Sequence, residues 1–196
     1  TYITCDRVGL DEDHCRFSLL ARSHRFLHMI VEDANPVRSR VSVRQAVVIM
    51  PPAVPARGQD AAWPSQMAPA LLQDLIGVLV AVNGVTLFTA APNLPDAVSL
   101  SRVLPEGIDV LVPEDETETR SQLLAAALRQ VLSRNFERVV AVAPDTIRLT
   151  VRTVSTALSA LASADAVAGR TPQGGLYLFG TKSLAGVELA SAADIA

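Results

Sequence analysis

The fold is decided by residues 138–180, which include the pieces RVVAVAPDTIRLT (138–150), ADAVAG (164–169) and GGLYLFG (174–180). The apolar runs in these three pieces have the length and composition of buried strands. Between the first two runs, residues 150–161 have the apolar spacing of a helix. A strand, a helix and a second strand in this order predict a right-handed crossover within a mainly parallel sheet.

The same alternation extends upstream to Gln45. Short apolar runs predict further strands at 46–50, 85–89 and 108–112, and helical spacing is found at 66–82, 96–104 and 119–134. Strands that alternate with helices form a sheet covered on both faces. Residues 45–196 are therefore predicted to form one α/β domain, a three-layer Rossmann-like sandwich with a mainly parallel sheet.

A parallel sheet of this kind also predicts where a ligand binds. Ligands lie outside the carboxyl ends of the strands in open α/β sheets. Three segments directly follow predicted strands, namely residues 51–59, 113–119 and 144–150. We expect the binding site among them.

The first 44 residues have a different pattern. Residues 2–8, 15–21 and 26–31 each have the composition of a short strand, and they are separated by polar turns. An antiparallel meander fits this pattern, although residues 17–31 also fit a helix. We expect residues 1–44 to be a β-rich extension packed on the main domain, with a homodimer contact through strand addition as one role.

Composition limits the classes of function. Of the 196 residues, 49% are hydrophobic and 19% are charged, which is typical of a globular chain. The net charge of -3 gives no electrostatic reason to expect nucleic acid or an anionic membrane as a partner. No apolar run approaches the roughly 20 residues of a spanning helix. A cytoplasmic protein is the expectation.

Residues 138–180 resemble the bacterial family of glycosyltransferase-A-like proteins associated with arsenosugar biosynthesis. In that family a strand ends in Asp-x-Pro-Asp-Leu-Thr, and a helix follows. Next come a strand Asp-Val-Val-Leu-Gly and a segment Asp-Gly-Gly-Tyr-Tyr-Leu-Ile-Gly. Here the corresponding pieces are APDTIRLT (143–150), DAVAG (165–169) and QGGLYLFG (173–180). The loop VPAR (54–57) resembles the family's Lys-Ala-Pro-Val-Pro-Gly-Arg loop more loosely, so the resemblance spans residues 45–196.

The resemblance implies a nucleotide-diphospho-sugar transferase fold and a nucleotide or nucleotide sugar as ligand. It also implies transfer of a glycosyl or nucleotidyl group, with Mg or Mn as cofactor. Such a reaction develops negative charge on a diphosphate leaving group. A divalent cation held by carboxylates, together with basic side chains, stabilises that charge.

Most of the expected catalytic acids are replaced in this chain. Asp145 matches the first acid of the family motif and is the residue we assign to catalysis and to a metal. Arg148 takes the place of the second acid, and Gln173 takes the place of the acid before the two glycines. The resemblance assigns Arg57 to the substrate phosphates, and Gly174 and Gly175 to the acceptor side. Arg148 departs from the family pattern, and the role we assign to it is to neutralise a phosphate of the substrate without a metal.

Each of these residues also has a structural interpretation. Asp145 is suited to capping a turn, and Gly174 and Gly175 are suited to a tight connection between strands. Arg57 also fits a solvated surface position. The run EDETE (114–118) fits the solvated first turn of a helix, where carboxylates favour the positive helix end. The same run offers Asp115 and Glu118 as acids of an alternative active site. The competing functional hypothesis is a catalytically inactive relative that acts as a binding or assembly module.

All the cysteine and histidine side chains lie near the N-terminus, at Cys5, His14, Cys15, His24 and His28. Four of them, Cys5, Cys15, His24 and His28, are of the types that zinc prefers. The separation of the two cysteines is wider than the two to four residues usual in zinc fingers. We therefore favour cysteines in core positions and exposed histidines, with zinc binding and a disulfide as the alternatives.

Overall fold

The computed structural model describes residues 2–6, 16–19, 43–51, 67–114, 117, 119–144, 149–171, 175–185 and 187–188. For residues 2–6, 16–19 and 67–69 it describes the backbone only. All statements below concern these residues. Within them, no helix is both long enough and apolar enough to cross a membrane.

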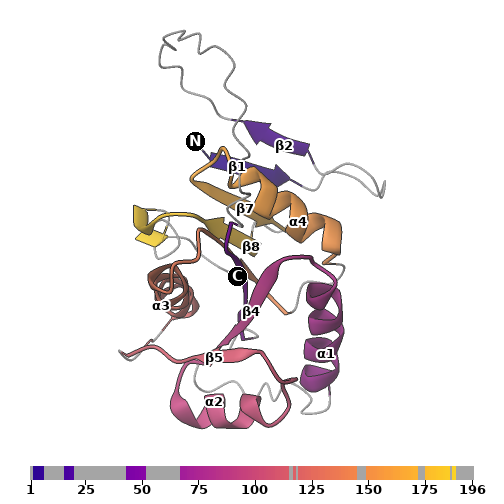
Figure 1. Ribbon diagram of the computed structural model, residues 1–196, viewed down its shortest axis with the longest axis vertical. Coiled ribbons are helices and arrows are strands. Elements are labelled where there is room, and N and C mark those ends of the chain that lie inside the picture. The colour runs from indigo at the N-terminus through magenta and orange to yellow at the C-terminus, as the bar shows by residue number, and fades with distance from the viewer. Residues whose placement is uncertain are drawn as a thin grey trace, which may run out of the picture.

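One sheet of eight strands forms the centre of the molecule (Figure 1). In spatial order the strands are β2-β1-β7-β8-β6-β3-β4-β5. Their bounds are β1 Tyr2–Asp6, β2 Arg16–Leu19, β3 Gln45–Ile49, β4 Val85–Ala90, β5 Asp109–Leu111, β6 Arg138–Val142, β7 Ala166–Arg170 and β8 Leu176–Thr181.

The sheet is mainly parallel, as the sequence predicts. β3 pairs in parallel with both β4 and β6, and β4 pairs in parallel with β5. β8 is antiparallel to both β6 and β7, so β7 runs in the same direction as β6. Only β2 and β8 run the opposite way, and the predicted fold class is confirmed.

Alternating side chains of the sheet bury two separate cores. In β3, Ala46 and Val48 belong to one core, and Val47 and Ile49 belong to the other. α3 (Arg120–Ser133) packs in the first core, whereas α1 (Met67–Val80) and α4 (Val151–Ala160) pack in the second. Figure 1 shows this three-layer arrangement, with α3 on one side of the sheet and α1 and α4 on the other.

Local capping chemistry sets the helix starts. Thr119 caps α3 through a capping box, in which its hydroxyl accepts from the Gln122 N–H and its own N–H donates to the Gln122 side chain. α2 (Leu94–Ser101) begins two residues before the predicted start, because Asn93 accepts a hydrogen bond from the Asp96 N–H and acts as its cap.

The N-terminal strands extend the sheet of the main domain. β1 and β2 lie within two of the three strands predicted for this region, and they pair antiparallel. The third, at 26–31, lies outside the described residues. β1 also pairs in parallel with β7, from Tyr2 opposite Ala166 to Asp6 opposite Arg170. This leaves β2 as one edge strand of the sheet, with β5 as the other.

Candidate functional site

The carboxyl ends of the parallel strands meet at one edge of the sheet, which we call the carboxyl edge. β3 ends beside Pro51, β5 beside Val112 and β6 beside Pro144. The pairing continues up to this edge, where the Met50 N–H donates to Val142 O over 2.9 Å. The three segments predicted to form the site therefore start at the same edge.

The strand order reverses between β3 and β6. From β3 the chain proceeds to β4 and β5 on one side of the sheet, and it then returns to place β6 on the other side of β3. Connections leave in opposite directions at such a point and open a crevice at the carboxyl edge, where α/β proteins bind ligands. Met50 and Ala143 directly follow β3 and β6 at this point.

Most residues assigned to the site from sequence lie outside the described part of the chain. These are Arg57, Asp145, Arg148 and Gly174, together with the alternative acids Asp115 and Glu118. Gly175 is described and is buried. Its carbonyl accepts a hydrogen bond of 2.7 Å from the Thr171 N–H, which closes the connection between β7 and β8.

Arg120 is a charged residue at this edge that the sequence interpretation did not single out. It is the first residue of α3 and is partly buried. Its side chain lines a small recess together with Met50 from the end of β3 and Ala143 after β6. A positively charged group therefore lies at the reversal of strand order. The sequence signal is its place, because it opens the helix that follows a predicted strand-end loop.

Tyr177 also lines this recess and is held there by a bulge in β8. Gly169 pairs with Leu178 and Arg170 pairs with Leu176, so Tyr177 is an extra residue in the ladder. Its ring lies directly over Gly169, and a Cβ atom at Gly169 would lie 2.6 Å from the ring carbon Cζ. The absence of a side chain at Gly169 therefore leaves room for the ring.

Thr89, near the carboxyl end of β4, carries a buried hydroxyl. The residue is 2% exposed, and among the described residues its Oγ1 finds no hydrogen-bond partner. The replacement Thr89→Val exchanges this hydroxyl for a methyl group of similar shape. We expect it to raise the free energy of unfolding by about 1 kcal/mol, because a buried polar group without a partner is destabilising. Chemical denaturation measures this change.

Thr181, which is 0% exposed, is the matched control. Its hydroxyl accepts from the Ser183 N–H at 3.1 Å and lies 3.1 Å from the Asp165 carbonyl. Thr181→Val removes these interactions and should lower the free energy of unfolding by about 1–3 kcal/mol. Equal losses in both variants would contradict our interpretation of Thr89.

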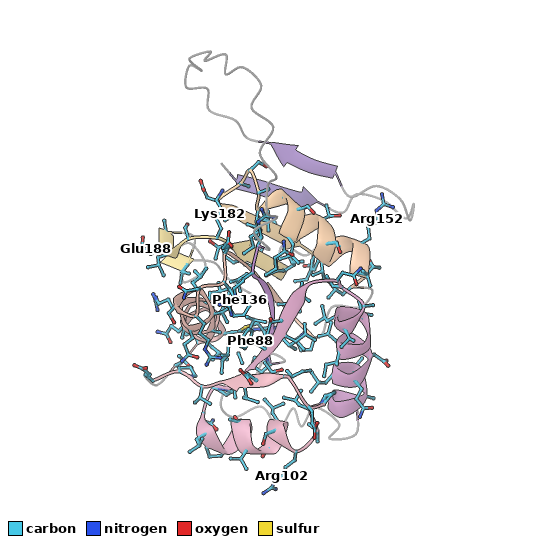
Figure 2. The ribbon with its side chains drawn as sticks, viewed as in Figure 1. Phe88, Arg102, Phe136, Arg152, Lys182 and Glu188 are labelled. Carbon is cyan, nitrogen blue, oxygen red and sulfur yellow. The ribbon has the colours of Figure 1, made fainter. Side chains whose placement is uncertain are left out.

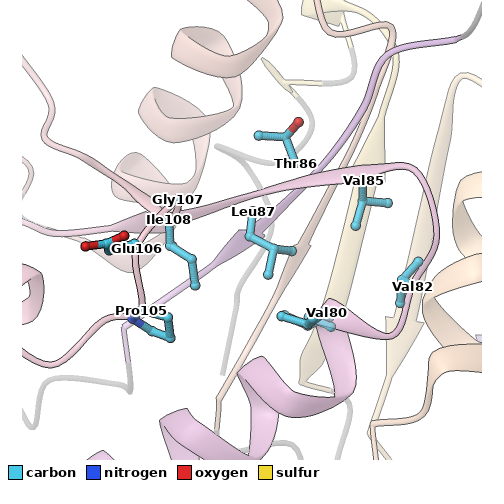
Figure 3. Close-up of a pocket in the computed structure, with 10 residues that line it drawn as sticks. Val80, Val82, Val85, Thr86, Leu87, Pro105, Glu106, Gly107 and Ile108 are labelled. Carbon is cyan, nitrogen blue, oxygen red and sulfur yellow. The ribbon is translucent and has the colours of Figure 1, made fainter.

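A larger hollow lies at the opposite edge of the sheet (Figure 3). It has a volume of about 300 Å³ and lies between the end of α1 and the amino ends of β4 and β5. Leu79, Val82 and Ile108 form apolar walls, and Glu106 is the only charged residue that lines it in the described part of the chain. We place the candidate site at the carboxyl edge despite this hollow, because the reversal of strand order lies there.

The ion pair between Asp165 and Lys182 is likewise remote from the carboxyl edge. The hydrogen bond and the positive charge of Lys182 lower the pKa of Asp165, whose Oδ1 lies 3.4 Å from Lys182 Nζ. A lowered folded-state pKa gives stabilisation that is present above the unfolded pKa and is lost as the pH falls through the folded pKa. Both residues lie at the amino end of β7 and are solvated, so the effect on stability is small.

The described residues contain no group of three or more His, Cys, Asp or Glu side chains that could hold a metal ion. Of the four residues considered for zinc, only Cys5 falls within them, as part of the β1 backbone. Cys15, His24 and His28 lie outside, and so does Asp145. The predictions of zinc and of Mg or Mn therefore stay predictions.

Comparison with known proteins assigns the family. The family model DUF2064, described as "Uncharacterized protein conserved in bacteria", matches residues 81–193, more than half of the chain. The chain belongs to this family. No curated protein matches the sequence. The matched residues of this DUF2064 protein run from the end of α1 through β8 and include Arg120, Asp145 and Tyr177.

Solved structures match this chain with different degrees of similarity. One is the crystal structure of a "putative nucleotide-diphospho-sugar transferase" from Desulfovibrio desulfuricans G20, with 18% identity and a TM-score of 0.56. The match covers 70% of this chain and 63% of that chain, so less than two thirds of that protein is represented here. Another is Rv0371c from Mycobacterium tuberculosis H37Rv, with 18% identity, a TM-score of 0.48 and coverage of 76% of each chain.

At this identity the first match shows the fold alone. This DUF2064 protein therefore has a nucleotide-diphospho-sugar transferase-like fold. The association with arsenosugar biosynthesis stays a prediction from the resemblance.

Proposed function

We propose that the protein binds a nucleotide-activated sugar at the carboxyl edge of its sheet, as a transferase of the glycosyltransferase A type. The observation that carries this proposal is the reversal of strand order between β3 and β6, within a fold shared with a protein named as a nucleotide-diphospho-sugar transferase. The segments that follow β3 and β6 in the sequence start at that point and contain Arg57, Asp145 and Arg148. In this proposal Arg57 and Arg148 contact the phosphates, and Gly174 and Gly175 line the acceptor side.

The side chains available fit a divalent cation poorly. Of the three acids in the family motifs only Asp145 is present, and the neutral Gln173 replaces the last one. Arg148 puts a positive charge in the place of the second acid, where it repels a metal ion. We therefore derive no catalytic step through a metal, and Asp145 is assigned to the ribose or to a weakly held Mg or Mn ion.

The second candidate function is a binding or assembly module without catalysis. The same replacements favour it. Arg148 and Gln173 stand where a transferase of this family has acids, whereas the basic residues Arg57 and Arg148 are present for an anionic ligand. A homodimer formed through the N-terminal strands belongs to this alternative, since β2 is an edge strand and edge strands offer unpaired backbone groups.

Thermal unfolding with a panel of nucleotides and nucleotide sugars tests the proposal. A ligand that binds only the folded state at 100 times its Kd stabilises the protein by about 2.7 kcal/mol. We expect such a stabilisation with one class of nucleotide, measured with and without Mg or Mn. Asp145→Ala should abolish transfer of the sugar from that donor, measured as release of free nucleotide.

Two results would count against the proposal. If no nucleotide or nucleotide sugar stabilises the protein, the proposal of a donor-binding site is wrong. Stabilisation without transfer, in the wild type and in the Asp145→Ala variant alike, would instead select the binding module. The apparent mass of the protein with and without the ligand then tests the assembly role.

A further inference from the structure

The turn between α1 and β4 contains the only Asn-Gly pair of the chain, Asn83-Gly84. Both residues are exposed, and Gly84 has a φ of +72°, a left-handed conformation that glycine adopts without strain. Within the described part of the chain, neither the Asn83 side chain nor the Gly84 N–H takes part in a hydrogen bond. The side-chain amide of Asn83 and the backbone nitrogen that follows it are therefore both accessible to reaction.

An asparagine followed by an unhindered backbone nitrogen can close a ring. The deprotonated Gly84 nitrogen attacks Cγ of Asn83, a new N–C bond forms, and the bond from Cγ to the amide nitrogen breaks. Ammonia leaves and carries away the proton that Gly84 lost, so a cyclic imide remains. Water then opens the imide. Opening at Cγ gives aspartate in an ordinary chain, and opening at the backbone carbonyl leaves the chain linked through Cγ, with one more methylene group in the backbone.

The other asparagines of the chain lack one or more of these conditions. Asn35 is followed by a proline, whose nitrogen has no hydrogen to lose. The amide of Asn93 is held at both ends, because its oxygen accepts from the Asp96 N–H over 2.9 Å and its nitrogen donates to the Asp96 carboxylate over 2.9 Å. Asn135 is followed by a phenylalanine with a buried ring, which crowds the attacking nitrogen. Asn83 alone combines a following glycine with exposure.

We propose that Asn83 is a site of spontaneous deamidation, which converts the turn between α1 and β4 into a mixture of aspartate and β-linked aspartate. The neighbouring residues Val82 and Val85 line the hollow at the amino ends of β4 and β5, so the new carboxylate lies close to that hollow (Figure 3). The modification is remote from the carboxyl edge, and this inference does not depend on the proposed function.

The two products should differ in their effect on the fold. Val82 is 5% exposed and belongs to the core between the sheet and α1, and Val85 packs against the same core. Aspartate at position 83 changes the charge and leaves the backbone intact. The β-linked product lengthens the backbone between two side chains that are fixed in the core. We therefore expect the β-linked form to be less stable than the aspartate form.

Incubation of the full chain at mildly alkaline pH tests the proposal, because base removes the proton from the Gly84 nitrogen. Peptide mapping by mass spectrometry follows the exchange of amide for acid at each asparagine, and enzymatic methylation detects β-linked aspartate. Asn83 should convert at least an order of magnitude faster than Asn93 and Asn135 in the same sample, with release of ammonia. Absence of conversion at Asn83, or equal rates at all three positions, overturns the proposal.

Two variants test the ring closure itself. Gly84→Ala should slow the conversion by an order of magnitude, because the added methyl group crowds the attacking nitrogen. Since Gly84 has a positive φ, this variant is strained, and Asn83→Gln is the second variant. Glutamine must close a larger ring and should also convert at least an order of magnitude more slowly. Conversion of both variants at the wild-type rate overturns the mechanism.

Asn83→Asp is the matched variant that separates the new charge from the change in the backbone. Its midpoint of unfolding in urea should be close to that of fresh wild type, because the carboxylate is solvated. Incubated wild type should contain a fraction with a lower midpoint, in proportion to its content of β-linked aspartate. Incubated protein that contains this product and unfolds at the midpoint of Asn83→Asp overturns the expected effect on the fold.

Discussion

Phe136→Ala should lower the free energy of unfolding by about 3–5 kcal/mol, because it removes a large ring from a packed core. Phe136 is 7% exposed and meets Phe88 edge to face, with ring centroids 5.4 Å apart (Figure 2). The guanidinium carbon of Arg44 lies 4.3 Å from the centre of the Phe136 ring. The loss is a large part of the 5–15 kcal/mol of a typical domain, and denaturation in urea measures it.

The backbone around Phe136 joins the end of α3 to the start of β3. Arg44, just before β3, donates from Nη1 to the Arg134 carbonyl over 2.9 Å, and its own carbonyl accepts from the Glu137 N–H over 2.8 Å. The turn after α3 is thereby fixed to the start of the central strand. Arg44→Met keeps the aliphatic stem and is the matched variant, with an expected loss of about 0.5–1 kcal/mol. A loss below about 1 kcal/mol in Phe136→Ala would contradict this role of the ring.

Local sequence patterns predicted most of the architecture, because they report burial directly. The run from Val139 to Val142 is apolar at every residue, and this is the pattern of a strand covered on both faces. The strand predicted at 164–168 is found at Ala166–Arg170 instead. Ala164 lies in the turn that follows α4, where its N–H donates to the Ala160 carbonyl over 2.9 Å.

Local sequence patterns could not predict which distant segments pair in the sheet. The parallel pairing of β1 with β7 joins residues that are about 160 positions apart, and no local signal specifies it. Arg120 was missed for a related reason. A single arginine at the start of a helix is not part of a periodic pattern. Its place beside Met50 and Ala143 is set by the tertiary structure and is not visible in the local sequence. Thr89 is likewise an ordinary strand residue in the sequence. Only the structure shows that its hydroxyl is buried and has no hydrogen-bond partner among the described residues.

Gly180→Ala should lower the free energy of unfolding by about 1–3 kcal/mol through overpacking. Gly180 lies in β8 opposite Val140 of β6 and Val167 of β7. An added Cβ atom would lie 2.8 Å from Val167 Cγ2 and 3.0 Å from Val140 Cγ2. Both valines are at most 2% exposed, and β-branched side chains are restricted at χ1, so they do not move aside easily. Urea denaturation measures the loss.

Two other glycines provide the controls, because an added methyl group meets different surroundings at each. At Gly77, exposed in α1, an added Cβ would have no neighbouring atom within 4 Å, and Gly77→Ala should stabilise the protein by about 0.5–1 kcal/mol. At Gly169 the added Cβ meets the ring of Tyr177. Tyr177→Ala should therefore relieve the cost of Gly169→Ala in a double-mutant cycle and leave the cost of Gly180→Ala unchanged. Relief at both glycines would show that β8 as a whole shifts, and that the ring of Tyr177 is not held by Gly169.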